Sequence, residues 1–248
     1  MSTASIPSNQ QRNVIEPVSS TEPIPPLENG DRLTRPEFER RYNAMPNIRA
    51  ELIEGIVYMA SPVSHQRHGI PHSHAMGWLS LYRFATPGVE TGDNSSLRLD
   101  SDNMPQPDAF LYILPKFGGQ LRVSDDDFIE TAPELIVEVA ASSVSYDLNS
   151  KFHAYRRNGV REYIVWRTRD RAVDWFVLEN GTYERLPLDP DGNYRSRVFP
   201  GLWLNPKALL EDDRPTMVRV SQEGSASAGH LAFVEKLKLA GTPKPTEG

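Results

Sequence analysis

The segment Leu135 to Ala140 (LIVEVA) is a run of aliphatic residues interrupted by a single carboxylate. A short apolar run of this kind predicts a strand buried in the interior of a sheet. A carboxylate in such a strand is costly unless another group pairs with it or binds to it. Glu138 therefore constrains the fold and, at the same time, points to a site.

The segments around this strand predict an α/β or α+β fold. Strand patterns precede and follow it, with turn signals at Glu54-Gly55 and Asn180-Gly181. The expected strands lie within residues 50–62 (two short strands), 89–94, 95–100, 108–114, 160–167, 172–180 and 183–188, and the expected helices within 31–45, 72–85, 145–159 and 205–210. Strands with intervening helices, followed by a β-meander, indicate one domain of roughly 180 residues.

The two ends of the chain differ from its middle. Residues 1–32 are rich in Ser, Pro, Gln and Glu and cannot bury enough apolar surface to offset the entropy of ordering, which predicts a disordered arm. Residues 33–212 form the predicted domain, whose first helix has capping-box spacing at Thr34 and Glu37. Residues 213–248 are expected to be a flexible tail in which residues 230–239 could form a short amphipathic helix.

Composition narrows the classes of function. The net charge of -6 provides no long-range attraction for nucleic acid, so such binding would need a local basic surface. Cysteine is absent, which excludes disulfides and thiolate metal sites. No stretch has the length and hydropathy of a membrane span, and the first residues lack the apolar core of a signal peptide. We therefore expect a cytoplasmic protein.

Glu138 could form a site together with two residues outside its strand, Asp108 and Lys151. A period of two places Asp108 on one face of its strand with Phe110, and Glu138 on one face of its own. If the two strands are neighbours, Asp108 and Glu138 meet at a strand end, where two carboxylates can hold a hard cation. Lys151, on the helix that follows, could then stabilise negative charge on a phosphate or orient an attacking water. The alternative is that Asp108 caps a turn and Glu138 forms a buried pair with Lys151 or an arginine.

Two groups of basic residues have open interpretations. His65, His68, His72 and His74 raise the possibility of a zinc site, but no HExxH motif is present and Pro71 separates the two pairs, so we expect the last three to be solvated or locally hydrogen-bonded. Arg156 and Arg157 belong to a basic excess between residues 151 and 171. This excess could contact a phosphate backbone, or it could be a solvated helix end.

An ordered series of motifs in this chain resembles the Uma-type restriction endonucleases of the PD-(D/E)XK nuclease superfamily. The motifs are YNAMPNIRAELIEGIVYMASPVSHQ, PQPDAFLYIL, APELIVEVAASS and DLNSKFHAYRRNGVREYIVW, and the resemblance covers residues 33–210. It implies a restriction-endonuclease-like core, in which helices flank a mixed sheet. It also implies a homodimer that cuts DNA with Mg²⁺, for which Mn²⁺ can substitute.

Site residues follow from the same resemblance, position by position. Asp108 and Glu138 correspond to the metal carboxylates, and the carbonyl of Val139 to a further ligand. Lys151 corresponds to the lysine that Uma-type proteins place on the helix after the strand. Glu54 matches the family's acidic residue near the site, where it would help catalysis through a bound water or a second metal. His65 and Gln66 match its His-Gln pair at the start of the first core helix and are expected to contact nucleic acid.

The chain also departs from the pattern of this family. Ala140 stands where the superfamily usually has a lysine, and the family's Leu-Ser-Pro after the glutamate is Ala140-Ala141-Ser142 here. Ile164 and Arg167 replace the usual Trp and Asp of the later strand. These departures motivate the alternative hypothesis of a catalytically inactive protein with the nuclease fold, acting as a nucleic-acid-binding or protein-interaction module.

Overall fold

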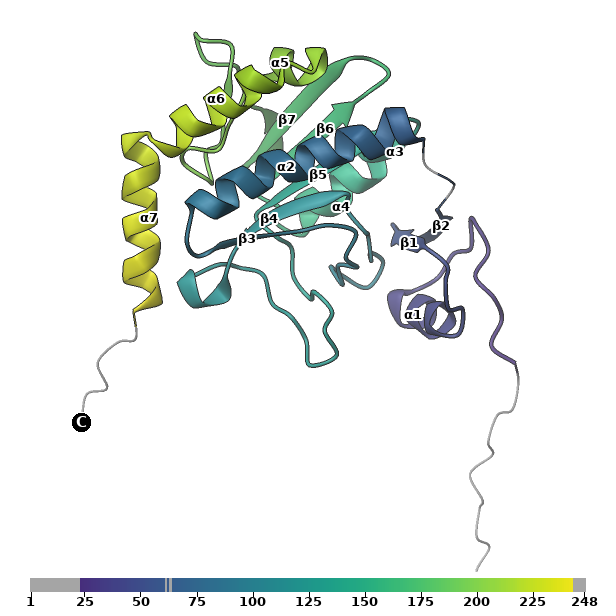
Figure 1. Ribbon diagram of the computed structural model, residues 1–248. Coiled ribbons are helices and arrows are strands. Elements are labelled where there is room, and N and C mark those ends of the chain that lie inside the picture. Colours follow the sequence, from purple (N-terminus) through teal and green to yellow (C-terminus); the bar gives the residue numbers. More distant parts are fainter. Residues whose placement is uncertain (1–22, 61, 63, 243–248) are drawn as a thin grey trace, which may run out of the picture.

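The fold is built on a six-stranded mixed sheet. The structure is a computed structural model that describes residues 23–60, 62 and 64–242 (Figure 1). The strands follow the order β3-β4-β5-β6-β7-β8, and every neighbouring pair is antiparallel except β5 and β6, which are parallel. Their bounds are β3 Val89–Gly92, β4 Ala109–Ile113, β5 Leu135–Ala140, β6 Glu162–Arg167, β7 Ala172–Glu179 and β8 Thr182–Arg185.

The aliphatic segment that contains Glu138 is β5. It lies inside the sheet between β4 and β6, and all six of its residues are buried. This arrangement confirms the predicted buried strand. The three consecutive strands β6, β7 and β8 form the predicted β-meander, with its hairpin turn at Asn180-Gly181.

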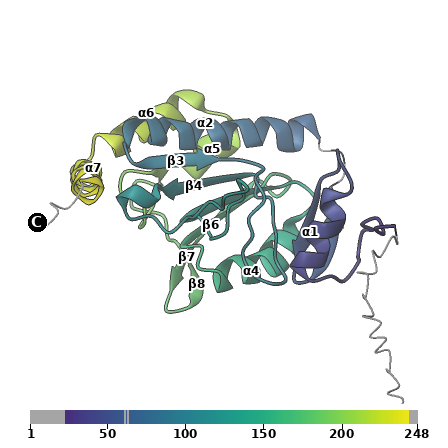
Figure 2. The same cartoon turned by 90° about the horizontal axis from the view of Figure 1, so that it is seen from below.

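Helices cover both faces of the sheet (Figure 2). On one face, Trp78 and Leu79 of α2 (Ile70–Ala85) pack against Val137 and Val139 of β5 in the largest apolar cluster. On the other face, Tyr155 packs against Ile136 and Ala140. The segment that carries it consists of α3 (Val144–Tyr146), the π-helical turn η3 (Asp147–Lys151) and α4 (Phe152–Arg157). Glu138 therefore faces the α4 side, as the period of two predicts.

A small N-terminal unit lies beside the end of this core. It contains α1 (Arg35–Asn43) and the hairpin of β1 (Ala50–Ile53) and β2 (Ile56–Met59), which turns at Glu54 and Gly55, both with positive φ. The predicted capping box is not formed, because Glu37 accepts hydrogen bonds from Arg40 and Arg41 instead. Within the predicted disordered arm, Leu27 is buried against this unit, whereas residues 1–22 lie outside the described residues.

The segment after residue 212 contains the short helix predicted for residues 230–239, which lies within α7 (Ala228–Gly241), but it has more regular structure than the predicted flexible tail. It forms two helices, α6 (Arg214–Ser225) and α7, and Leu237 of α7 is buried against the main cluster. Helix α6 buries Val220 and packs Met217 against the main cluster, and it also makes a close contact through a glycine. A Cβ on Gly224 would lie 2.2 Å from the carbonyl oxygen of Gly201. A close backbone contact of this kind adds no apolar residue to the sequence pattern.

The remaining elements are short, and two of them correct local predictions. Residues 95–100 form isolated bridges rather than a strand. Helical structure starts before residue 72, because the π-helical turn η1 (His65–Gly69) runs directly into α2 and Pro71 occupies the first turn of α2. The other elements are η2 Pro115–Phe117, β9 Tyr194–Arg195, β10 Trp203–Leu204 and α5 Pro206–Glu211. Among the described residues, no helix has the length and apolar character needed to cross a membrane.

Candidate active site

Asp108 and Glu138 lie at the same end of neighbouring strands. Ala109 of β4 pairs with Val137 of β5, so the antiparallel register brings Asp108, one residue earlier, to Glu138, one residue later. Oδ2 of Asp108 also accepts a hydrogen bond of 2.7 Å from the backbone N–H of Val139. The predicted convergence of the two carboxylates is therefore present in the structure.

Lys151 completes the arrangement from the other side of Glu138. Its Nζ lies 2.9 Å from Oε1 of Glu138 and 2.9 Å from Oε1 of Glu51. Oε1 of Glu138 also accepts a hydrogen bond of 2.8 Å from the hydroxyl of Tyr155. The π-helical turn η3 ends at Lys151 and carries Asp147, whose Oδ1 lies 4.0 Å from the same ammonium.

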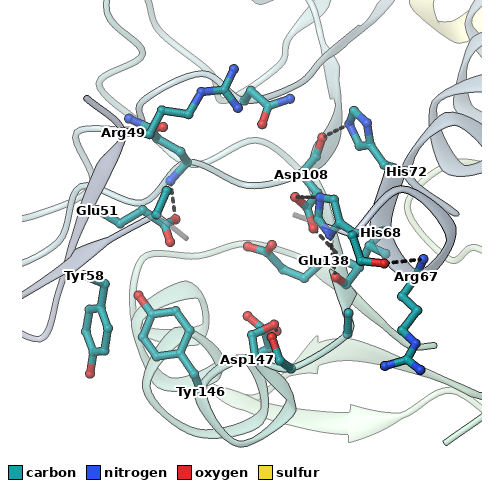
Figure 3. Close-up of a pocket in the computed structure, with 18 of the residues that line it drawn as sticks. Arg49, Glu51, Tyr58, Arg67, His68, His72, Asp108, Glu138, Tyr146 and Asp147 are labelled. Atoms are coloured by element: carbon teal, nitrogen blue, oxygen red, sulfur yellow. Dashed lines mark hydrogen bonds and ion pairs between the residues drawn. The ribbon is translucent and has the colours of Figure 1, made fainter. Parts of the chain in front are cut away.

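These residues line one cavity of about 530 Å³ (Figure 3). Three of its four acidic lining residues come from the core, at the start of β4, on β5 and on η3. The fourth, Glu51, comes from β1, so the N-terminal unit forms one wall of the cavity. The ionisable lining residues are Arg49, Glu51, Tyr58, Arg67, His68, His72, Asp108, Glu138, Tyr146, Asp147, Lys151 and Arg169.

The four carboxylates of the cavity outnumber the buried cations near them. Burial raises the pKa of Glu138 well above its usual value, although the charge of Lys151 opposes this shift. Burial likewise raises the pKa of Asp147 to about 6. Burial acts in the same direction on Asp108, but the hydrogen bond and charge of His68 hold the pKa of this residue below its usual value. The deprotonated forms of Glu138 and Asp147 are therefore costly in this cavity, and a bound cation would stabilise them by supplying positive charge.

Lys151 keeps its proton in this environment. Burial by itself lowers the pKa of a lysine, but the negative charges of Glu138 and Glu51 raise the pKa of Lys151 well above its usual value. The ammonium therefore acts as a fixed positive charge and not as a base.

The structure places Glu51, not Glu54, in the cavity. Glu54 lies in the turn between β1 and β2, where its carboxylate is 2.8 Å from Nη2 of Arg157, and it does not line the cavity. The signal that identifies Glu51 is the strand period. Ala50 and Leu52 are buried on one side of β1, and Glu51 points to the other side.

The structure also places different histidines in the cavity from the one that the resemblance indicated. His65 and Gln66 are exposed on η1 and do not line the cavity. His68 does: its Nδ1 donates to the Val139 carbonyl at 3.1 Å, and its Nε2 lies 3.3 Å from Oδ1 of Asp108. His72, four residues later on the same helical face, donates from Nε2 to the Asp108 carbonyl at 2.8 Å. Both histidines are hydrogen-bonded, which is one of the two expected outcomes, but their partners are the distant Val139 and Asp108 and not local groups.

The arginines predicted to contact nucleic acid lie elsewhere. Nη1 of Arg156 donates to the carbonyl of Gly181 at 2.6 Å, and Arg157 pairs with Glu54. Neither lines the cavity. The arginines that do line it are Arg49, Arg67 and Arg169.

The donor set determines which metal the site could hold. Nowhere among the described residues do three or more His, Cys, Asp or Glu side chains converge on one metal position, and the four neighbouring histidines do not share one. Asp108 and Glu138 contribute two carboxylates and Val139 a carbonyl oxygen, although His68 contacts that carbonyl here. Mg²⁺ commonly binds through one or two carboxylates, keeping waters and substrate oxygens as its other ligands. The residues present therefore fit a partly hydrated Mg²⁺ or Mn²⁺.

Comparisons with known proteins agree with this fold. A search of curated proteins found no significant match. Among solved structures, a protein from Anabaena variabilis described as a "putative nuclease belonging to DUF820" superposes with a TM-score of 0.53 at 15% sequence identity, covering 69% of this chain and 96% of that chain. At this identity the similarity establishes the fold, a mixed sheet flanked by helices, as the resemblance implied.

The family assignment depends on the sequence itself. The Uma2 family model, described as "Putative restriction endonuclease", matches residues 35–207. This match includes the strands and helices that carry Glu51, Asp108, Glu138 and Lys151. The chain belongs to the Uma2 family of restriction-endonuclease-like proteins.

Proposed function

We propose that this protein is a Mg²⁺-dependent endonuclease that hydrolyses phosphodiester bonds in DNA. One observation carries the proposal: Asp108, Glu138 and Lys151, from three separate elements, converge on one cavity. Two carboxylates next to a protonated lysine fit the hydrolysis of a phosphodiester, in which negative charge develops on the phosphate oxygens. Membership of the Uma2 family supports the same reaction class.

Asp108 and Glu138 would hold the metal, with the Val139 carbonyl as a further oxygen ligand. A bound Mg²⁺ would supply Lewis acidity and lower the pKa of an attacking water, and Mn²⁺ could take its place. His68 and His72 would position these ligands, since they contact Asp108 and the Val139 carbonyl. Glu54 has no part in this mechanism because it lies outside the cavity.

Lys151 would stabilise the charge that develops on the scissile phosphate. Glu51 and Glu138 hold its ammonium from two sides, so the cation is oriented before substrate binds. Preorganisation of this kind is effective because it requires no rearrangement during the reaction. Glu51 thus takes the supporting role that the sequence assigned to Glu54. We further propose that the protein is a homodimer, because cleavage of two strands requires two sites. A cytoplasmic location is proposed separately, from the sequence.

A second candidate is a non-catalytic protein with the same fold, acting as a nucleic-acid-binding or protein-interaction module. This candidate is favoured by the environment of Glu138. The carboxylate is buried and already contacts Lys151 and Tyr155. In that case the pair is structural and Mg²⁺ does not bind. Titration calorimetry with Mg²⁺ and Mn²⁺ separates the two, since only a nuclease site should bind either ion in a manner that depends on Asp108.

The deciding experiment is a cleavage assay on supercoiled plasmid and single-stranded DNA in Mg²⁺ and in Mn²⁺. We expect metal-dependent nicking by the wild type and none by Glu138→Ala. Glu54→Ala is the matched control, because it removes a carboxylate that lies outside the cavity, and it should cut like the wild type. Equal cleavage by wild type and Glu138→Ala would refute the proposed site, and folded wild-type protein that neither cuts DNA nor binds metal would favour the second candidate.

A further inference from the structure

The charged residues of the cavity divide into a buried floor and an exposed rim. The floor carboxylates are shielded, with side-chain exposures of 3% for Asp147, 4% for Glu138, 15% for Asp108 and 20% for Glu51. The rim consists of three exposed arginines, namely Arg49, Arg67 and Arg169. A polyanion that approaches from solvent therefore meets positive charge before it reaches the acidic floor.

None of the rim arginines forms an ion pair within the described part of the chain, in contrast to Arg157 and Arg98. Arg157 pairs with Glu54 and Asp100, and Arg98 pairs with Glu39 and Asp126. No carboxylate of the described residues lies within ion-pair distance of a rim arginine. Their guanidinium groups line the cavity without a protein counter-charge, which leaves them available to anions of a ligand.

The rim arginines occupy two opposite edges of the cavity. Arg67 on η1 and Arg169 in the turn between β6 and β7 are neighbours, because the hydroxyl of Thr168 donates to the Arg67 carbonyl at 2.9 Å. Arg49 lies on the other edge, in the connection that leads into β1. Figure 3 shows Arg49 and Arg67 on opposite sides, with Asp108 and Glu138 between them.

This placement suits a chain of phosphates better than a single phosphate. One phosphate over the floor would contact Lys151 and a metal, and an exposed arginine on either edge would add contacts only to phosphates further along the strand. We infer that Arg49 on one edge, and Arg67 with Arg169 on the other, bind backbone phosphates of a polynucleotide on the two sides of the scissile phosphate. The inference deepens the proposed nuclease function and rests on it for the identity of the central phosphate.

The test measures binding separately from cleavage. A fluorescein-labelled phosphorothioate DNA of 16 nucleotides, single-stranded or duplexed, resists hydrolysis, so anisotropy in Mg²⁺ gives Kd and its dependence on salt. The variants are Arg67→Gln/Arg169→Gln and Arg49→Gln. The matched control is Arg122→Gln/Arg161→Gln, which removes two exposed arginines that also lack an ion pair in the described region but do not line the cavity.

We expect each rim arginine removed to lower the slope of log Kd against log salt by about 1. The double rim variant should therefore lose about 2 from the slope and bind at least about tenfold more weakly at low salt, whereas the control double variant keeps the wild-type slope. Circular dichroism and urea denaturation establish that the variants are folded.

The outcomes separate this inference from the proposed function. Equal slopes for the rim and control variants would overturn the phosphate path, even if the wild type cleaves unmodified DNA. Loss of slope in the rim variants only, together with wild-type cleavage that requires Glu138, would support both. Loss of slope in the rim variants with no cleavage by the wild type would overturn the nuclease assignment and leave the phosphate path standing. A wild type that neither binds nor cuts DNA would overturn both.

Discussion

The ammonium nitrogen of Lys151 lies 2.9 Å from Oε1 of Glu138, and both side chains are buried. Removal of one member of a buried ion pair leaves the other charge uncompensated. We expect Lys151→Met to lower the free energy of unfolding by about 3–5 kcal/mol, and Lys151→Met/Glu138→Leu to regain most of this loss. Urea denaturation measures both effects. A single variant as stable as the wild type would show that the ion pair does not form.

The same pair affects how catalytic variants are interpreted. Lys151→Ala and Asp108→Ala should both abolish cleavage under the proposed mechanism, but only Lys151→Ala leaves the carboxylate of Glu138 without its counter-charge. Activity should therefore be measured at a temperature at which urea or thermal denaturation shows each variant to be folded. Full cleavage by either folded variant would exclude that residue from the site.

Glu51 and Glu54 provide a comparison within one hairpin. Glu51→Gln weakens the charge that holds Lys151 in place and should reduce cleavage by at least about tenfold, a loss of about 1.4 kcal/mol in transition-state stabilisation. Glu54→Gln should cut at the wild-type rate because its carboxylate pairs with Arg157 outside the cavity. Steady-state cleavage rates of the two variants test this prediction. Slower cleavage by Glu54→Gln than by Glu51→Gln would assign Glu54 to the site instead.

Two tyrosines near the site differ in their hydroxyl contacts. The hydroxyl of Tyr155 donates to Glu138 at 2.8 Å, whereas that of Tyr146 has no hydrogen-bond partner among the described residues. Hydrogen bonds to charged groups contribute about 1.5–3 kcal/mol, so Tyr155→Phe should lower stability by about this amount. Tyr146→Phe should leave stability close to that of the wild type. Thermal denaturation of the two variants side by side tests the difference.

The carboxyl of Asp147 predicts a pH dependence of stability. Its pKa is raised from 3.8 to about 6 by burial, so the folded state binds this proton more tightly than the unfolded state does. The associated stabilisation is complete below pH 3.8 and is lost as the pH rises through about 6. Asp147→Asn does not ionise and should gain up to about 3 kcal/mol relative to the wild type between pH 4 and 7.5.

Urea denaturation at the two pH values tests this prediction, with Asp125→Asn on an exposed loop as the control. A constant difference between Asp147→Asn and the wild type across this range would contradict it.

The C-terminal helix α7 should contribute to the stability of the core. Leu237 is 3% exposed and packs in the main cluster, whereas Leu239, two residues later, is 76% exposed. Leu237→Ala should cost about 2–5 kcal/mol of unfolding free energy, and Leu239→Ala less than about 0.5 kcal/mol. Equal effects in urea denaturation would indicate that α7 does not pack as described and that the segment is the tail expected from the sequence.

Much of the fold could be predicted because hydrophobic periodicity is a local property. The aliphatic run of β5, the turn at Glu54-Gly55 and the meander after β6 all appear in the sequence as patterns within a few residues. The same patterns placed Asp108 and Glu138 on definite faces of their strands. Helix α6 was not predicted, and part of its packing, the close approach of Gly224 to Gly201, involves glycines that add nothing to an apolar pattern.

Buried carboxylates illustrate what sequence patterns could not decide. Glu134 and Glu162 are as buried as Glu138, but their carboxylates accept hydrogen bonds from backbone N–H groups of nearby segments, such as Ile113 and Arg197. A local pattern predicts burial of all three residues and does not identify their partners. Only Glu138 meets a lysine from another element, together with a second carboxylate, in a cavity.

The sequence by itself determined the six strands of the main sheet, the buried position of Glu138 and the helical segment that carries Lys151, because these depend on spacing along the chain. The tertiary structure decided that Glu51 rather than Glu54, His68 and His72 rather than His65, and Arg49, Arg67 and Arg169 rather than Arg156 and Arg157 face the cavity. These choices depend on how distant segments pack against one another. Neighbouring residues of the same type look alike in a sequence, and the rotation of a helix or the end of a strand determines which of them reaches the site.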